Sequence, residues 1–308
     1  MRPLVVGTRQ SELALTQTEW VVNRLKEVCP GLEVRVEKIV TKGDRILNVT
    51  LSKVGGKGLF VKEIEQALLD KRIDFAVHSM KDMPGEMPKG LVIGAIPVRE
   101  NPLDCLLSRE GHTLNDLPAG SVVGTSSLRR QAQILACRPD LKVEPVRGNL
   151  GTRLSKMKNG QFDAIILAAA GLSRMSWQDE ISQELPVEQM LPAVGQGALA
   201  VECREDDEEL LALLQKINHE ETARAVWAER AFLRSFHGGC HLPLAGYAEV
   251  IGDEVRLTGL VAQPDGKKIL RATLQGQDEW DLGERLAKEL IDQGAGELLA
   301  TVREGLVG

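Results

Sequence analysis

Two clusters of arginine lie between positions 123 and 153, each beside a turn rich in glycine and in hydroxyl or amide side chains. Arg129 and Arg130 follow Gly-Thr-Ser-Ser-Leu, and Arg147 precedes Gly-Asn at the start of a segment that carries Arg153. Helix starts favour bound anions, and a guanidinium binds carboxylates or phosphates in a bidentate manner. We therefore expect the four guanidiniums to converge on a small ligand with several acidic groups. The alternative is a solvated basic face.

Cys240 follows two glycines and lies between His237 and His241. It could be a buried inert thiol, a metal ligand, or a nucleophile or point of covalent attachment. A metal site made of these three side chains would lack one ligand and would have poor spacing. The glycines favour a loop that projects the thiol, so covalent chemistry is the leading interpretation. The other four cysteines are scattered without a C-x-x-C motif, which predicts neither a disulfide framework nor a zinc ribbon.

Lys81-Asp82 follows the apolar segment Phe75-Ala76-Val77, which predicts a buried strand. One interpretation is an ion pair between the two side chains at the strand end. The other places the carboxylate in a crevice opposite the arginines, where it stabilises a cationic intermediate or transfers a proton.

The segments that carry these groups follow a repeated pattern. Val5-Val6-Gly7-Thr8 recurs as Val122-Val123-Gly124-Thr125, each time as a strand, a turn and a hydroxylated helix start. A predicted helix leads into Asp74–Val77, and another leads into Asp163–Leu167. Two related α/β domains are therefore expected. Because open α/β sheets bind ligands at the carboxyl ends of their strands, the ligand should lie between the two domains.

A length of 308 residues predicts more than one domain. We expect an α/β fold with two doubly wound domains like those of periplasmic binding proteins, a cleft between them, and a small C-terminal α+β domain. The first domain is expected to span 1–98 with a return segment 198–217, the second 102–193, and the third, which carries the cysteine loop, 220–308. Pro97–Pro102 is expected to be a hinge, and the glycine-rich segment Thr41–Gly58 a mobile flap.

Hydrophobic spacing predicts the individual elements. A strand from Val34 to Val40 is expected to alternate between buried and exposed side chains. The helix before it is expected to bury Ala14, Val21, Leu25 and Val28.

The composition limits the classes of function. The net charge is −6, with 43% hydrophobic and 27% charged residues, as in an ordinary globular protein. The negative charge and an aromatic content of 3% oppose nucleic-acid binding through Arg129 and Arg130. No signal peptide or membrane span is predicted, so a cytoplasmic location is expected.

Eight motifs together resemble those of the porphobilinogen deaminase family, also called hydroxymethylbilane synthases. They cover nearly the whole chain in the family's order and close to its spacing: TRQSELAL, KVGGKGLFVKE, AVHSMKDMP, VGTSSLRRQ, RGNLGTRL, ILAAAGLSR, LPAVGQGAL and GGCHLPLAGYA.

The resemblance implies a transferase of tetrapyrrole (haem and porphyrin) biosynthesis that deaminates four porphobilinogen molecules and condenses them head to tail to hydroxymethylbilane. It also implies a priming dipyrromethane cofactor, attached by a thioether to Cys240. The family's catalytic aspartate falls on Asp82. The cofactor-binding positions are Lys81, Asp82, Thr125, Ser127, Arg129 and Arg130, and the substrate-binding positions are Arg9, Ser11, Lys53, Lys57, Arg147, Arg153, Arg174 and Gln196.

The resemblance further implies a monomer that uses no metal ion and passes its product to uroporphyrinogen III synthase. The chain departs from the family pattern at His241 and Leu242, where glutamine and valine or isoleucine are expected, and at Ala245, where glycine is more usual. These changes leave the thiol in place.

A solute-binding or effector-sensing protein would share the two-domain crevice. No signal peptide or helix-turn-helix is predicted before the first strand, and a projecting cysteine has no role in a reversible binder. An intact mass separates the two classes, because only the enzyme carries a covalent adduct.

Overall fold

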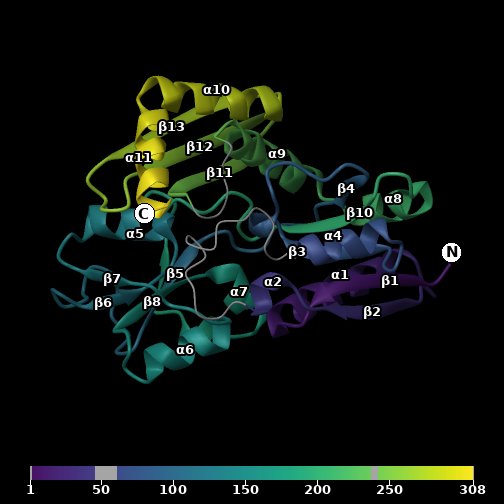
Figure 1. The fold of residues 1–308 in the computed structure, drawn as a ribbon, viewed down its shortest axis with the longest axis horizontal. Coiled ribbons are helices and arrows are strands. Elements are labelled where there is room, and N and C mark those ends of the chain that lie inside the picture. The colour runs from purple at the N-terminus through teal and green to yellow at the C-terminus, as the bar shows by residue number, and fades with distance from the viewer. Residues whose placement is uncertain (1, 46–60, 237–241, 308) are drawn as a thin grey trace.

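A computed structural model describes residues 2–45, 61–236 and 242–307 (Figure 1). The described residues form two α/β units, each around a five-stranded sheet, and a C-terminal α+β unit around a three-stranded sheet. This architecture confirms the predicted fold class. Most of the predicted flap, with Lys53 and Lys57, and the loop with Cys240 lie outside the described residues.

The first α/β unit has the strand order β2-β1-β3-β10-β4. β1 pairs in parallel with β2 and β3, whereas β10 is antiparallel to both β3 and β4. The sheet packs against helices that contribute Val21, Leu25 and Leu213 to the core. Its elements are β1 (Leu4–Arg9), α1 (Glu12–Val28), β2 (Val34–Ile39), α2 (Lys42–Arg45), α4 (Lys62–Leu69), β3 (Phe75–Ser79), the 3₁₀ turn η1 (Met80–Asp82), β4 (Leu91–Ala95), β10 (Leu199–Arg204), α8 (Glu208–Leu214) and the 3₁₀ turn η3 (Gln215–Ile217).

The second α/β unit repeats this arrangement with the order β7-β6-β8-β5-β9. β6 pairs in parallel with β7 and β8, and β5 is the antiparallel fourth strand, as β10 is in the first unit. The predicted internal repeat is therefore confirmed. The elements are β5 (Asp104–Ser108), β6 (Val122–Gly124), α5 (Leu128–Cys137), β7 (Lys142–Glu144), α6 (Leu150–Lys158), β8 (Ala164–Ala168), α7 (Ala169–Arg174), the 3₁₀ turn η2 (Gln178–Glu180) and β9 (Gln183–Leu185).

The C-terminal unit is an antiparallel sheet in the order β11-β12-β13. It lies above the two α/β units in Figure 1 and packs against α9 and α10 around the fully buried Phe232, Leu257 and Leu286. Its elements are α9 (Glu220–Ser235), β11 (Leu244–Ile251), β12 (Glu254–Ala262), β13 (Ile269–Gly276), α10 (Glu279–Asp292) and α11 (Ala295–Val307). None of the described helices is long and apolar enough to cross a membrane.

Two local predictions are wrong in detail. Ala14, Val21 and Leu25 are buried on α1 as expected, but Val28 is 37% exposed at the end of the helix. Val36 is 47% exposed, because β2 lies at the edge of its sheet and its outer surface faces solvent.

A buried cluster of two glutamates and one histidine includes a residue of β3, the strand that leads to Asp82. His78 Nε2 lies 2.9 Å from Glu202 Oε2, and Glu202 is fully buried. Glu65 of α4 is also buried, and its Oε1 has no hydrogen-bond partner among the described residues. Burial, followed by the nearby Glu202, raises the pKa of Glu65 to about 6, although His78 and Lys62 act in the opposite direction.

We predict that Glu65→Gln stabilises the protein at pH 7. A carboxyl whose pKa is raised on folding binds its proton more tightly in the folded state, so stability falls as the pH rises from about 4.5 to 6. The variant should gain about 1 to 2 kcal/mol at pH 7 and nothing below about pH 4.5. Urea unfolding at several pH values measures this gain, with Glu19→Gln at an exposed position of α1 as the control. A gain that does not change with pH would contradict the prediction.

Candidate active site

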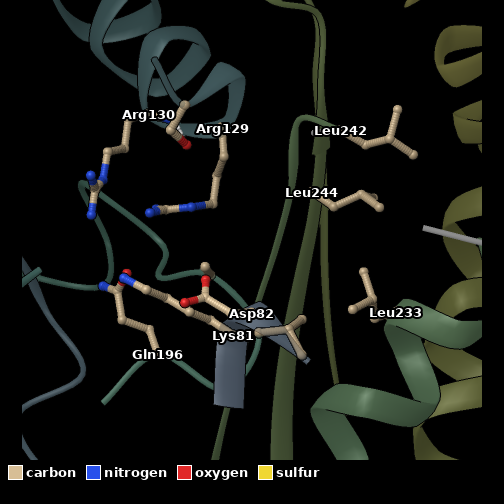
Figure 2. Close-up of a pocket in the computed structure, with 11 residues that line it drawn as sticks. Lys81, Asp82, Arg129, Arg130, Gln196, Leu233, Leu242 and Leu244 are labelled. Atoms are coloured by element: carbon tan, nitrogen blue, oxygen red, sulfur yellow. Dashed lines mark hydrogen bonds between the residues drawn. The ribbon is translucent and has the colours of Figure 1, made fainter. Parts of the chain in front are cut away.

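A cavity of about 160 Å³ lies where the two α/β units meet the C-terminal unit (Figure 2). One wall is polar and consists of side chains from η1, the start of α5, and Gln196. The opposite wall is apolar and comes from α9 and the residues around the start of β11. The lining residues are Lys81, Asp82, Ser127, Arg129, Arg130, Ala193, Val194, Gln196, Leu233, Leu242 and Leu244.

Asp82 stands in the cavity at the end of η1, directly after the buried strand β3. Figure 2 shows its carboxylate pointing into the cavity below Arg129. Among the described residues, no hydrogen bond or ion pair within 4 Å engages this carboxylate, although Lys81 precedes it in the chain. The predicted alternative of a Lys81–Asp82 ion pair that closes the strand is therefore absent.

The hydroxyl groups predicted at the start of α5 cap the helix. Ser127 is the N-cap residue, and its Oγ accepts a long hydrogen bond of 3.5 Å from the backbone N–H of Arg130. The buried Thr125 Oγ1 accepts from the backbone N–H of Ser127 at 3.2 Å. Of the two residues, Ser127 lines the cavity.

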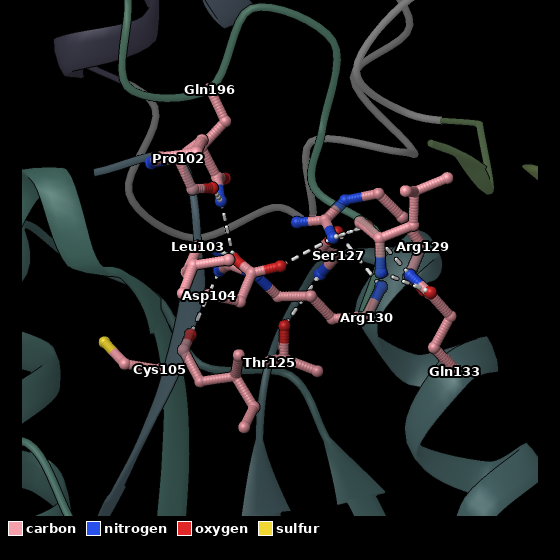
Figure 3. A network of polar contacts seen from close by, with 12 residues as sticks. Pro102, Leu103, Asp104, Cys105, Thr125, Ser127, Arg129, Arg130, Gln133 and Gln196 are labelled. Carbon is pink, nitrogen blue, oxygen red and sulfur yellow. Dashed lines mark hydrogen bonds and ion pairs between the residues drawn. The ribbon is translucent and has the colours of Figure 1, made fainter. Parts of the chain in front are cut away.

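Arg129 and Arg130 converge on a single buried carboxylate, that of Asp104 (Figure 3). Arg130 donates from Nε and Nη2 to Asp104 Oδ1 at 3.0 and 2.7 Å, and Arg129 Nη1 donates to Oδ2 at 2.6 Å. Asp104 is fully buried at the start of β5, and the two guanidiniums hold the pKa of its carboxyl well below the usual range against the effect of burial. One carboxylate thus balances part of the charge of the arginine pair.

Asp104 is a residue that the sequence analysis missed. The segment after the predicted hinge reads Leu103-Asp104-Cys105-Leu106, and an acidic residue in such an apolar run was the available signal. A carboxylate in a buried strand requires a cationic partner, because an unpaired buried charge is strongly destabilising.

Gln196 links the same carboxylate to the connection between the units. Its Nε2 donates to Asp104 Oδ1 at 3.0 Å and to the carbonyl oxygen of Pro102 at 2.7 Å. Its Oε1 is buried and has no hydrogen-bond partner among the described residues. A ligand N–H group could therefore donate to this amide oxygen.

Arg153 lies close enough to Arg130 and Arg147 for the three charges to repel one another. Its Nε donates to the carbonyl oxygen of Gly148 at 2.8 Å, and no other hydrogen bond joins its guanidinium to the described residues. Burial, with repulsion from the two other arginines, lowers the pKa of Arg153 to about 10. Arg130 and Arg147 therefore each lie near Arg153, and Arg129 shares Asp104 with Arg130.

Arg174 and Arg9 occupy positions in two different units. Arg174 Nη2 donates to the carbonyl oxygen of Gly197 at 2.9 Å, and burial lowers its pKa to about 10. Arg9 binds Asp44 through Nε and Nη2, and Ser11 caps α1 by accepting from the backbone N–H of Ala14 at 3.3 Å. These three residues do not line the cavity itself.

The charges around the cavity suit a ligand with several carboxylates. Burial, with repulsion from Arg130 and Arg129, lowers the pKa of Lys81 to about 8, although Asp82 and Asp104 oppose the shift. Bound anions would relieve the repulsion among these cations. The apolar wall and the open Gln196 oxygen suit an organic ring that carries an N–H group. The described residues contain no group of three His, Cys, Asp or Glu side chains that could hold a metal ion.

The sequence matches known proteins over most of its length. Residues 4–212 match the family described as porphobilinogen deaminase, dipyromethane cofactor binding domain, and residues 223–292 match the porphobilinogen deaminase C-terminal domain. The porphobilinogen deaminase of Brevibacillus brevis is 61% identical over 96% of each chain. That of Bacillus subtilis is 57% identical over 99% of this chain and 98% of its own.

Similar solved structures include two periplasmic binding proteins. One is an arginine-specific protein of Salmonella typhimurium, with a TM-score of 0.42 and 16% identity over 70% of this chain and 93% of its own. The other is the aliphatic sulphonate binding protein of Escherichia coli, with a TM-score of 0.42 and 15% identity over 76% of this chain and 70% of its own.

We predict that Asp104→Asn destabilises the protein by about 3 kcal/mol at pH 7, because it removes the charged carboxylate that two buried guanidiniums bind. It should also lower the pKa of Lys81 below about 8, since Asp104 raises that pKa. Denaturant unfolding measures the first effect, and the pH dependence of Lys81 acylation, followed by mass spectrometry, measures the second.

Asp74→Asn is the matched control. Asp74 is a buried partner of Arg2 and Arg204 in the first unit, remote from the cavity. The Asp74→Asn variant should lose stability without a change in the pKa of Lys81. Equal Lys81 titration in both variants would show that Asp104 does not set the charge of the cavity.

Proposed function

The chain belongs to the porphobilinogen deaminase family, whose members are transferases, and from this premise we propose that it joins four porphobilinogen molecules into hydroxymethylbilane. Each joining step breaks the carbon–nitrogen bond of one protonated aminomethyl group, which releases ammonia, and forms a carbon–carbon bond to a second pyrrole, whose ring carbon loses a proton. Water then adds to the methylene carbon of the first unit as the bond that tethers this unit breaks, which releases the linear tetrapyrrole. The observation that carries the proposal is the cationic cavity, in which the Asp82 carboxylate has no hydrogen bond or ion pair with the residues that the structure describes.

We assign the resident cofactor to this cavity, in line with the family match to a dipyrromethane cofactor binding domain. The cofactor supplies the free pyrrole carbon to which the first substrate is joined. The proposed attachment point is the thiol of Cys240, through a thioether. The carboxylates of the cofactor would be held by Lys81, Arg129 and Arg130, together with hydroxyl and backbone groups at Thr125 and Ser127. All five residues lie at or beside the polar wall.

The proposed substrate site extends from this wall toward Arg153. Each porphobilinogen carries two carboxylates, so a growing chain requires several fixed cations. The proximity of Arg153 to Arg130 and Arg147 supports a continuous row of cations. The residues proposed to bind substrate are Arg9, Ser11, Lys53, Lys57, Arg147, Arg153, Arg174 and Gln196.

Asp82 is the proposed catalytic residue. Loss of ammonia from porphobilinogen leaves a methylene-pyrrole cation whose charge is shared with the pyrrole nitrogen. A carboxylate beside that N–H group stabilises the cation and can accept the proton that is released when the new bond forms. No described side chain occupies the Asp82 carboxylate, which supports both roles.

The remaining proposals concern organisation. We propose three domains at 1–98 with 198–217, 102–193 and 220–308. We also propose a cytoplasmic monomer that passes its product to uroporphyrinogen III synthase.

We predict that the purified protein carries a mass increment of two linked pyrrole units on Cys240. Intact mass followed by peptide mapping, after expression with a working tetrapyrrole pathway, measures it. Cys240→Ser should give the bare mass, and Cys137→Ser, at an exposed cysteine, should keep the adduct. An adduct on another cysteine, or none in the parent, would overturn the assignment.

We predict that Asp82→Asn lowers turnover by at least about 10²-fold, the scale of a general acid–base or charge-stabilising group. Its melting temperature should change little, because the Asp82 carboxylate makes no hydrogen bond with the described residues. Steady-state formation of hydroxymethylbilane by cofactor-loaded protein measures the effect, and Asp82→Glu should retain part of the activity. Turnover of the Asn variant within a few-fold of the parent would remove Asp82 from the mechanism.

A further inference from the structure

The turn between β12 and β13 (residues 263–268) contacts the backbone of α5. Gly266, at the tip of this turn, has a φ of +74°. A Cβ atom added to it would lie 2.5 Å from the nitrogen of Ala136 and 2.7 Å from the carbonyl oxygen of Ala132. Real Cβ atoms do not approach backbone atoms so closely, so this contact leaves no room for a side chain.

Two faces of α5 pack against two different units. Leu128 packs against the core of the C-terminal unit, and Ala132 packs with Leu260 and Ala262 of β12. Residues 128, 132 and 136 lie on one helix face because they are four apart. Ile134 belongs to the core of the second α/β unit. The helix is therefore fixed between the C-terminal sheet and the second sheet.

A second contact reinforces the first. Arg271 of β13 donates from Nη1 to the carbonyl oxygen of Glu188 at 3.0 Å and from Nη2 to that of Val187 at 3.1 Å. These carbonyls belong to the segment that follows β9 of the second unit. The β12–β13 hairpin thus contacts the second unit both at α5 and after β9, in addition to the packing of β12 on α5.

The two walls of the cavity meet across this interface. α5 carries Arg129 and Arg130 of the polar wall, while Leu242 and Leu244 of the apolar wall lie at the start of the C-terminal sheet. β11 pairs with β12 along its whole length, starting from Leu244 opposite Val261. The apolar wall and the end of β12 therefore move together. The separation of the walls depends on how closely the β12–β13 turn approaches α5.

We propose that Gly266 is a positioning residue for the cavity. By allowing backbone contact with α5, it sets the distance between the helix that presents the arginines and the sheet that follows Cys240 in the chain. Its importance for cofactor loading rests on the function proposed above. The contact itself does not depend on that function.

The test compares Gly266→Ala with Gly252→Ala. Gly252 lies in the β11–β12 turn with a φ of +60°, and a Cβ added there would meet nothing within 4 Å. Both variants place alanine at a positive φ, so they share the backbone strain, but only the first pushes against α5. Amide hydrogen exchange across residues 128–137 should rise at least tenfold in Gly266→Ala and stay unchanged in Gly252→Ala. Loading of the apoprotein with porphobilinogen, followed by intact mass, should slow at least tenfold in the first variant alone.

The Gly266→Asn variant separates the effect of steric contact with α5 from the effect of backbone strain. Asparagine tolerates positive φ better than alanine but is larger. Gly266→Asn should therefore be at least as defective as Gly266→Ala. Arg271→Gln removes the second contact without altering the turn and should raise exchange in α5 in the same direction, to a smaller extent.

Three results would overturn the proposal. The first is equal exchange in the Gly266 and Gly252 variants, and the second is recovery in Gly266→Asn. The third is normal loading despite faster exchange in α5. A parent protein that never acquires an adduct would instead refute the proposed function, and the exchange comparison would still decide whether Gly266 positions α5.

Discussion

One buried carboxylate, that of Glu229 on α9, binds groups from three separate segments of the chain. Arg99 donates to its two oxygens at 2.6 and 3.2 Å, and the backbone N–H groups of Gly195 and Ala248 donate at 2.6 and 2.8 Å. Glu229 is fully buried, so each of these bonds offsets the large cost of removing its charge from water. Because the donors lie in the predicted hinge, in the connection between β9 and β10, and in β11, the interaction ties both connections between the α/β units to the C-terminal unit.

Asp104 satisfies the same constraint at the cavity. A buried carboxylate must be matched by cations, and the match here is made by side chains that also face the proposed ligand. Arg129 and Arg130 therefore have fixed positions before any ligand is present, which reduces the reorganisation needed on binding. Burial and repulsion from neighbouring arginines lower the pKa of both Lys81 and Arg153, and such an environment suits the acidic ligand proposed for the cavity.

Short-range patterns in the sequence predicted much of the fold. The recurrence of Val-Val-Gly-Thr predicted two similar units, and β1 and β6 do occupy equivalent places in their sheets. Strands β4, β5 and β9 were not identified. β4 and β5 are short apolar runs, whose type periodicity alone does not settle, and β9 is only three residues long. The missing β5 concealed Asp104, and the edge position of β2 left Val36 exposed, since neither the neighbour of a strand nor its place in a sheet is encoded locally.

The sequence by itself determined which chemistry is available: clustered guanidiniums at helix starts, a carboxylate at a strand end and a thiol between histidines after two glycines. These features depend on residues a few positions apart, so capping and periodicity are enough to reveal them. Only the tertiary structure decided how the charges pair. Asp104 binds arginines 25 and 26 positions away, Asp82 forms no ion pair with the neighbouring Lys81, and Gly266 lies against α5. Such pairings depend on which strands and helices become neighbours, and that choice is made by packing of the whole chain.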